Sequence, residues 1–378
     1  MNDPVSSNSL DAPSMPVVAT RDLPYLTADL PGIGGHWKDQ AEDFIVEEIP
    51  AYEPNGAGEH LFLWVEKKDV AANDLVHHVA RSLHCSPRDI GVAGLKDRRA
   101  ITRQYLSVPA KLAAEVPNID NDSIHVLRSA QHANKLKTGH LRGNRFTILI
   151  RDVSESALER ATAIADRIRT CGFPNYYGAQ RFGHNGETLQ LGLDLLTGRK
   201  KSRDLPGSQR RFLLRLALSA VQSDLFNRAL SQRLADGKLN KVLAGDIMEV
   251  VASGGKFIAE DVRAEQPRYD AGETAVTGPM FGLKMREPGG IPQHREADLL
   301  AWSGLGPEHF SKYLNLMTGT RRAYVIRPGD LQISADPNGL RFDFSLPSGV
   351  YATTLLREFM KSDNMPLAPE AEEGSDDE

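Results

Sequence analysis

The chain has 378 residues, of which 40% are hydrophobic and 25% charged, and its formal net charge is −5. This composition is typical of a soluble globular protein with two or three domains. No apolar run is long enough to span a membrane, and the two cysteines, Cys85 and Cys171, lie too far apart for a Cys-x-x-Cys zinc site. We expect a cytoplasmic protein with two buried cysteines and no disulfide framework.

The charge is unevenly distributed. Six carboxylates lie within residues 370–378, and without them the net charge is +1. Residues 128–151 contain six Lys or Arg and no acid, and residues 199–215 contain seven with one acid. Such blocks fit either a phosphate-binding face or a solvated surface balanced by acids elsewhere. Residues 1–20 are rich in Ser and Pro and lack the basic-then-apolar order of a signal peptide. We predict disorder for 1–22 and for 362–378.

Strand patterns dominate residues 44–153. Runs rich in branched residues or with period-two alternation occupy 44–49, 60–65, 104–108, 123–127 and 145–151. One helix interrupts them, with Asn73 as its N-cap and an apolar stripe from Leu75 to Leu83. A second helix follows Ser156, which has capping-box spacing to Glu159, and ends at Gly172.

The pattern becomes helical after residue 183. Helices are predicted at 212–234 and 309–317, and the Gly- and Pro-rich residues 238–295 predict short strands and loops. Strand patterns return at 323–326 and 340–346, before a last helix at 353–361. This order predicts an α+β fold in which one domain is inserted into another, with the C-terminal strands completing the first sheet.

A single carboxylate, Asp97, lies between Lys96 and the pair Arg98 and Arg99. Nearby cations favour the charged form of a carboxylate. Such a group either anchors an ion pair or stays ionised as a base or nucleophile beside a polyanion.

Residues 173–183 interleave aromatic rings with amide and guanidinium groups, among them Gln180 and Arg181. Single-stranded RNA is recognised by such stacking and hydrogen-bonding groups, but the segment also fits an interdomain hinge. Phe146, which follows Asn144 at the start of a strand, either packs in the core or presses on an unstacked base. The sequence has no phosphate-binding loop, no complete dinucleotide motif and no zinc-deaminase signature.

Five segments, in this order, resemble the TruD family of tRNA pseudouridine synthases: 43–48, 94–104, 143–146, 174–183 and 346–358. The resemblance implies a pseudouridine-synthase core with a largely antiparallel mixed sheet flanked by helices, made of residues 23–171 and 320–361. It also implies an inserted α/β TRUD domain at 172–319. The implied reaction is isomerisation of uridine to pseudouridine, usually at position 13 of certain tRNAs. This reaction needs no cofactor or metal, and the resemblance implies no protein partner.

The resemblance also implies roles for particular residues. Asp97 falls on the position of the nucleophilic aspartate, and the chemistry leaves open whether it attacks the sugar, attacks the uracil ring or takes a proton from the sugar. Tyr351 falls where bacterial relatives carry phenylalanine. The expected substrate-binding residues are Phe44, Asn144, Phe146, Tyr351 and Lys96, and the expected RNA contacts are Arg98, Gln180 and Arg181.

Two other functions remain open at this stage. A non-catalytic RNA-binding or RNA-folding protein would explain the basic blocks and the rings but would give Asp97 no task. A nucleoside hydrolase could use a similar carboxylate, and it would release free uracil.

Overall fold

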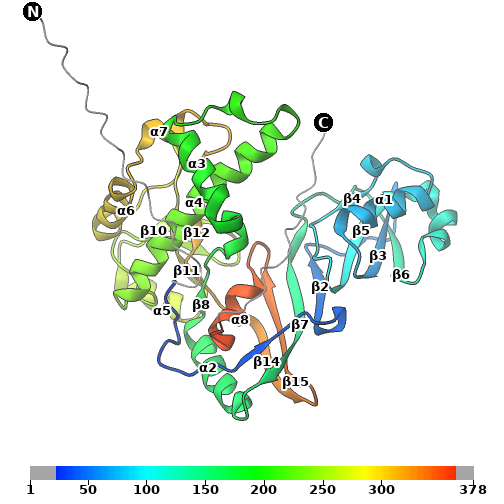
Figure 1. Cartoon of the computed structure of the whole chain (residues 1–378), viewed down its shortest axis with the longest axis horizontal. Coiled ribbons are helices and arrows are strands. Elements are labelled where there is room, and N and C mark those ends of the chain that lie inside the picture. Colours follow the sequence, from blue (N-terminus) through cyan, green and yellow to red (C-terminus); the bar gives the residue numbers. More distant parts are fainter. Residues whose placement is uncertain (1–22, 363–378) are drawn as a thin grey trace, which may run out of the picture. The chain divides into compact units, whose positions relative to one another are not determined.

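The computed structural model describes residues 23–362 (Figure 1). The segments predicted to be disordered lie outside these residues, apart from residue 362. The described chain forms two compact units, one of residues 23–24 and 181–324 and the other of residues 25–180 and 325–362. The domain limits predicted from the sequence, 172 and 319, stay predictions.

The larger unit is built on one sheet with the strand order β14-β15-β7-β2-β5-β3-β6, in which β1 also pairs with β7 and β4 with β5. Among these described strands, only β2 and β5 pair in parallel; the other pairs are antiparallel. This confirms the predicted largely antiparallel mixed sheet, which the C-terminal strands complete. The strands are β1 Gly34–His36, β2 Phe44–Pro50, β3 His60–Lys68, β4 Gly91–Val92, β5 Ile101–Pro109, β6 Ile124–His132, β7 Leu141–Val153, β14 Gly329–Asp336 and β15 Gly339–Pro347.

Helices cover this sheet at two places (Figure 1). Helices α2 (Ala157–Cys171) and α8 (Ala352–Met360) bury apolar side chains against β7, β14 and β15. Helix α1 (Ala72–Ser82) packs with the 3₁₀ segment Ala110–Ile119 over β3, β5 and β6. Shorter elements are the 3₁₀ turns Ala41–Asp43 and Pro87–Asp89, and the pair β8 (Phe173–Pro174) with β13 (Val325–Ile326).

The smaller unit combines helices with an antiparallel sheet of order β10-β9-β11-β12. Its longest element, α4, packs against α3, α6 and β11. The elements are α3 Glu187–Thr197, α4 Arg210–Ala235, β9 Ile247–Val250, β10 Lys256–Ile258, α5 Val262–Asp270, β11 Thr274–Met280, α6 Gly290–Trp302, α7 Pro307–Ser311 and β12 Thr320–Ala323, with 3₁₀ turns at His184–Gly186, Ser202–Asp204 and Gly207–Gln209. A further 3₁₀ turn, Ala179–Phe182, begins in the larger unit and ends in the smaller one.

Several local predictions were wrong. The helix predicted at 309–317 ends at Ser311 and continues as turns, and Leu314 on this stretch is exposed, so it adds nothing to a buried apolar face. The strand predicted at 323–326 is divided between β12 and β13, which pair with different strands. Neither α5 nor most of α6 was expected, because their Pro and Gly residues resemble loop sequence.

The helix caps and cysteines also differ from expectation. Asn73 lies inside α1, whose N-cap is Ala71, and the Ser156 side chain makes no capping hydrogen bond. Gly172 does end α2, with a φ of 70° that suits glycine. Both cysteines are free and half-buried rather than buried.

Candidate active site

Asp97 lies on the loop between β4 and β5, with 31% of its side chain exposed. Its Oδ1 is 3.5 Å from Nζ of Lys38, and its backbone carbonyl accepts a hydrogen bond of 2.7 Å from Nζ of Lys67. Two amines therefore hold this aspartate, one through its carboxylate and one through its backbone. The neighbouring Arg98 and Arg99 are exposed.

Lys38 comes from the loop after β1 and has a positive φ of 70°. It is 7% exposed, and its ammonium lies 4.0 Å from the ring centre of Phe44 and 4.6 Å from that of Trp37. Burial lowers the pKa of Lys38, while the charge of Asp97 opposes this effect. The aromatic faces and Asp97 both favour the ammonium form, so the site combines a carboxylate, a cation and an aromatic ring.

Lys67 is fully buried at the end of β3, where its Nζ also donates to the carbonyl of Val70. Burial lowers its pKa to about 8, and the charge of Asp97 partly counteracts this shift. A buried amine that needs hydrogen-bond acceptors fixes the position of the backbone that supplies them. Lys67 thus anchors the loop at Asp97.

Lys96 points to a different partner from its sequence neighbour. The residue is 7% exposed, and its ammonium donates a 2.9 Å hydrogen bond to Oε2 of Glu48, which is also buried. Oε1 of Glu48 accepts from the backbone N–H of Tyr105 at 3.4 Å. The ion pair joins β2 to the Asp97 loop and neutralises two buried charges. The predicted substrate contact of Lys96 stays a prediction.

Polar side chains form a row across three neighbouring strands. The register pairs Glu48 of β2 with Asn144 of β7, and it pairs Val46 with Thr102 of β5, two residues before Gln104. Because alternate residues of a strand point to the same face, Gln104, Glu48 and Asn144 share one face. Oε1 of Gln104, Oδ1 of Asn144 and Oγ1 of Thr102 are buried and have no hydrogen-bond partner among the described residues. Such unpaired groups are costly unless a ligand or water satisfies them.

Phe44 and Phe146 lie on the same face as this row. Their rings stack with centroids 6.1 Å apart, and Phe146 also stacks on Phe344 at 5.3 Å. Phe44 is 2% and Phe146 6% exposed, and both belong to the apolar cluster beneath α2 and α8. The rings therefore form an apolar floor beside Asn144. Contact with a base stays a prediction.

The remaining predicted residues lie elsewhere. Tyr351 precedes α8, half-buried, with its ring centroid 6.4 Å from that of Tyr177. Gln180 is half-buried, and Nη2 of Arg181 donates to Oγ of Ser219 within the smaller unit. The aromatic rings of residues 173–183 are buried, which favours packing over display of those rings: Phe173, Tyr176, Tyr177 and Phe182.

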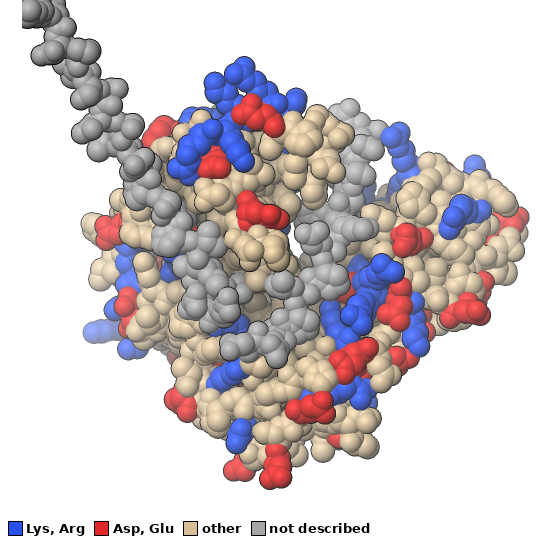
Figure 2. Space-filling model, in the orientation of Figure 1, with Lys and Arg blue, Asp and Glu red and all other residues tan. Residues whose placement is uncertain are grey.

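The basic block at 199–215 lies on the smaller unit and is exposed. Lysine and arginine side chains gather near the ends of α3 and α4, with acidic side chains among them (Figures 1 and 2). Arg199 pairs with Asp194 at 2.8 Å, and the ring of Phe212 is 40% exposed beside the basic residues. This surface could contact phosphates, and its one exposed ring could contact a base.

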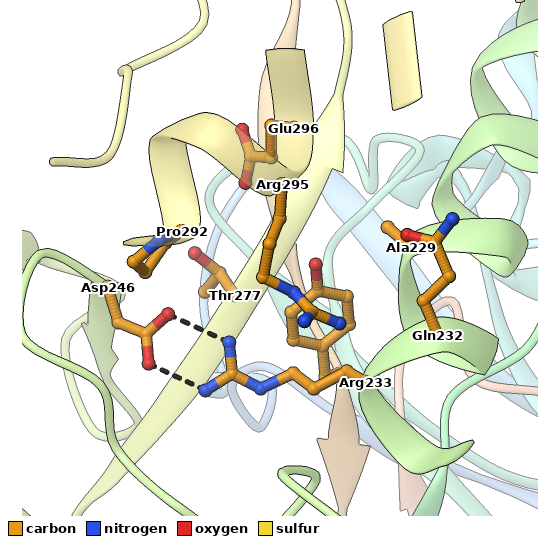
Figure 3. Close-up of a pocket in the computed structure, with 9 residues that line it drawn as sticks. Ala229, Gln232, Arg233, Asp246, Thr277, Pro292, Arg295 and Glu296 are labelled. Atoms are coloured by element: carbon orange, nitrogen blue, oxygen red, sulfur yellow. Dashed lines mark hydrogen bonds and ion pairs between the residues drawn. The ribbon is translucent and has the colours of Figure 1, made fainter. Parts of the chain in front are cut away.

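A separate cavity within the smaller unit is lined by charged side chains (Figure 3). Arg233 of α4 makes a two-fold ion pair with Asp246, with N–O distances of 2.6 and 2.8 Å. Glu296 of α6 is held by Arg321 in the same way, and burial raises the pKa of Glu296. The cavity measures about 10 Å³, which is room for about one water molecule. These pairs tie α4 and α6 to the sheet and leave no space for a substrate.

Within residues 23–362, no cluster of three or more His, Cys, Asp or Glu side chains is suited to hold a metal ion. No helix of this part of the chain has the length and apolar character needed to cross a membrane.

Sequence reasoning identified Asp97, Phe44, Asn144 and Phe146, which the structure places on one unit. It missed Lys38, Lys67 and Glu48, and it gave Gln104 no role. A signal existed for two of these residues. Glu48 continues the buried alternation of Phe44 and Val46, and Lys67 continues that of Leu63 and Val65, so each puts a charge on a buried face.

The chain was compared with known proteins. The family model of tRNA pseudouridine synthase D (TruD) matches residues 21–203 and 208–359. The chain is 42% identical to a tRNA pseudouridine synthase D of Anaeromyxobacter dehalogenans over 90% of its own length and 97% of that protein. For a protein of the same name from Thermus thermophilus, the identity is 40%, over 93% and 97%.

A solved structure shows the same fold. It is a crystal structure provisionally assigned as tRNA pseudouridine synthase D from Methanosarcina mazei, which is 26% identical to the chain. It superposes with a TM-score of 0.74 over 90% of this chain and 96% of that one.

Proposed function

Because the chain belongs to the tRNA pseudouridine synthase D family, we propose that it isomerises a uridine of tRNA to pseudouridine, with Asp97 as the reacting carboxylate. The observation that best supports this proposal is the partly exposed carboxylate of Asp97 beside the buried ammonium of Lys38. We propose position 13 of the tRNA as the target and the cytoplasm as the location.

The reaction separates the uracil from its ribose carbon, turns the base and rejoins it through a ring carbon. An ionised carboxylate can assist by attacking the sugar carbon, by attacking the uracil ring or by taking a proton from the sugar. Each route requires that Asp97 start without its proton. The ammonium of Lys38, whose Nζ lies 3.5 Å from Oδ1 of Asp97, is the cation paired with this carboxylate.

The target base must leave its stack before Asp97 can reach the nucleotide, at a cost of a few kcal/mol, roughly. Phe44 and Phe146 supply an apolar floor, and Asn144 supplies an amide at its edge. We add Gln104 to this set because its amide lies on the same face and also has an unpaired oxygen. An amide both donates and accepts, which matches the carbonyl and N–H groups along the edge of uracil.

The exposed basic block at 199–215 is the proposed grip on the tRNA body. A grip that works by charge releases counterions, so the affinity for tRNA falls steeply as salt is added.

The first test is Asp97→Asn, which keeps the size of the side chain and removes its charge. The purified variant and the wild type are incubated with unmodified tRNA, and pseudouridine is located by carbodiimide labelling and primer extension. We expect a new stop for the wild type and none for Asp97→Asn. Pseudouridine formed by the variant at the wild-type rate would show that Asp97 is not the nucleophile.

The same experiment separates the two other functions. Protection of the tRNA by the wild type without a new stop would indicate a binding protein. Release of free uracil would indicate a hydrolase, since an isomerase keeps the base attached to the RNA.

A further inference from the structure

An open pocket lies on the larger unit between the chain after β2 and the loop that joins β6 to β7. Its volume is about 490 Å³, within the range of small-molecule and cofactor sites. None of its lining residues is acidic: they are Tyr52, His132, Asn134, Lys135, Lys137 and His140.

One wall of the pocket is aromatic. The rings of Tyr52 and His132 stack with centroids 5.0 Å apart and planes at 20°, and Phe62 supports His132 at 4.7 Å. The backbone N–H of Asn55 donates to Nδ1 of His132 at 3.3 Å, so the proton of the neutral imidazole is on Nε2, available to an acceptor. The hydroxyl of Tyr52 lies 2.6 Å from Nδ1 of His140 and fixes a second ring.

The pocket is also positively charged. Lys135 lines the pocket, and its ammonium donates to the carbonyl of Arg88; Lys137 also lines it and is exposed. Two other cations of the same basic block have defined partners: Arg151 pairs with Asp43 at 2.7 Å, and Arg128 lies over the ring of Trp64. The two lysines are the members of the 128–151 block that line this pocket.

We propose that this pocket binds one nucleotide of the substrate RNA, with its base against the rings of Tyr52 and His132 and its phosphate beside Lys135 and Lys137. A flat ring wall suits a base of any sequence, and lysines and an imidazole N–H suit phosphate oxygens. The identification of the RNA as tRNA rests on the proposed function. The inference that the pocket binds a nucleotide rests on its own rings and lysines.

The pocket is separate from the Asp97 loop, since none of its lining residues belongs to that loop. His132 of the pocket pairs with His60, which also pairs with Pro109 at the end of β5, whereas Asp97 precedes the first residue of β5, Ile101. The opposite wall lies nearer, because the backbone N–H of Gly139, beside His140, donates to the carbonyl of Ala93. The nucleotide in the pocket is therefore a neighbour of the target uridine rather than the target itself. The pocket acts on RNA affinity rather than on the chemical step.

The experiment measures tRNA affinity of the full chain by filter binding, for the wild type, Lys137→Glu and His132→Leu. Lys137 is exposed, and leucine keeps apolar packing on Phe62, so both variants are expected to fold. We expect each to bind tRNA about ten-fold more weakly, as expected for the loss of one stacked or phosphate-bound nucleotide. Arg81→Glu, a charge reversal at an exposed site on α1, is the control and keeps wild-type affinity.

Turnover and a free nucleotide give the second readout. Lys137→Glu is expected to raise KM for whole tRNA while kcat is kept, and to leave unchanged the KM for a stem-loop too short to reach the pocket. Wild-type tRNA affinity in both variants would overturn the proposal. Uridine monophosphate is the free-nucleotide probe, and its binding is seen as shifts of the His132 imidazole signals. If it binds the wild type while both variants keep wild-type tRNA affinity, the pocket is a site for free nucleotides and the proposal is also overturned. A wild type that binds tRNA without turnover would refute the proposed function alone.

Discussion

At the scale of single residues, the candidate site depends on charged side chains that are buried, where removal from water costs free energy. Lys38, Lys67, Lys96 and Glu48 are each less than a tenth exposed. Their partners are far away in the chain: 59 residues separate Lys38 from Asp97, and 30 separate Lys67 from Asp97. The local sequence around Asp97 suggested that Lys96, Arg98 and Arg99 hold its charge. In the structure, Lys96 pairs with Glu48, and Lys38 is the residue that pairs with Asp97. No pattern in the sequence near Asp97 indicates this pairing.

Lys38→Met tests the electrostatic role of this amine. Methionine fills a similar volume over Phe44 but leaves the carboxylate of Asp97 without its ion-pair partner. We expect kcat to fall about a hundred-fold, the usual cost of one electrostatic contact in an active site. Lys38→Arg should restore part of the activity, and a wild-type kcat in Lys38→Met would contradict the role.

Lys67 should make the stability of the larger unit depend on pH. Burial lowers its pKa to about 8 from 10.5, so between these values the unfolded chain holds a proton that the folded chain has lost. The free energy of unfolding therefore rises with pH in this window, by at most about 3 kcal/mol. Urea unfolding of the wild type and of Lys67→Met at pH 7.5 and pH 10 measures this effect as a difference. A difference that is the same at both pH values would refute it.

At the scale of elements, alternation and apolar stripes were enough to locate most of the larger unit. The strand runs at 44–49, 60–65 and 145–151 lie inside β2, β3 and β7, and the helix after Ser156 is α2. Sequence patterns failed where contacts with the rest of the fold decide the conformation of a segment. The apolar run at 323–326 is divided at Tyr324, which follows β12 and precedes β13, so its two halves belong to different sheets. The Pro-containing α5 is a helix with Asp261 as its N-cap.

The ion pair in Figure 3 gives an element-scale prediction for α4. Arg233→Met leaves the buried carboxylate of Asp246 without its two-fold partner. We expect a loss of stability of about 3–5 kcal/mol, measured by urea unfolding. The double variant Arg233→Met with Asp246→Leu removes both charges and should recover much of this loss. Equal losses in the single and double variants would show that the pair contributes shape rather than charge balance.

At the scale of the whole molecule, the sequence predicted the class of sheet and the return of the chain to it. The family resemblance predicted an RNA substrate, which composition alone could not predict, because the net charge of −5 conceals the exposed basic block. Which basic residues remain available could not be predicted, since it depends on acids nearby in space, such as Asp194 beside Arg199.

Salt dependence tests the basic block at this scale. Lys200 and Lys201 are exposed, and their replacement by glutamine should reduce the slope of log affinity for tRNA against log salt by roughly two. The double variant of Lys241 and Lys256 to glutamine, on the same unit, removes the same charge outside the block and should keep the slope. Equal slopes for the wild type and both double variants would exclude the block from the tRNA contact.

The order of strands also has a consequence for synthesis on the ribosome. β7, which carries Asn144 and Phe146, ends at Val153, but its sheet neighbour β15 begins only at Gly339. At typical elongation rates, roughly 10 to 40 s separate the two strands. During that interval, one edge of β7 has no β15 to pair with while the whole smaller unit is made. A nascent chain of this protein therefore carries an unpaired strand edge, on the strand that holds two of the candidate site residues, until its last strands emerge.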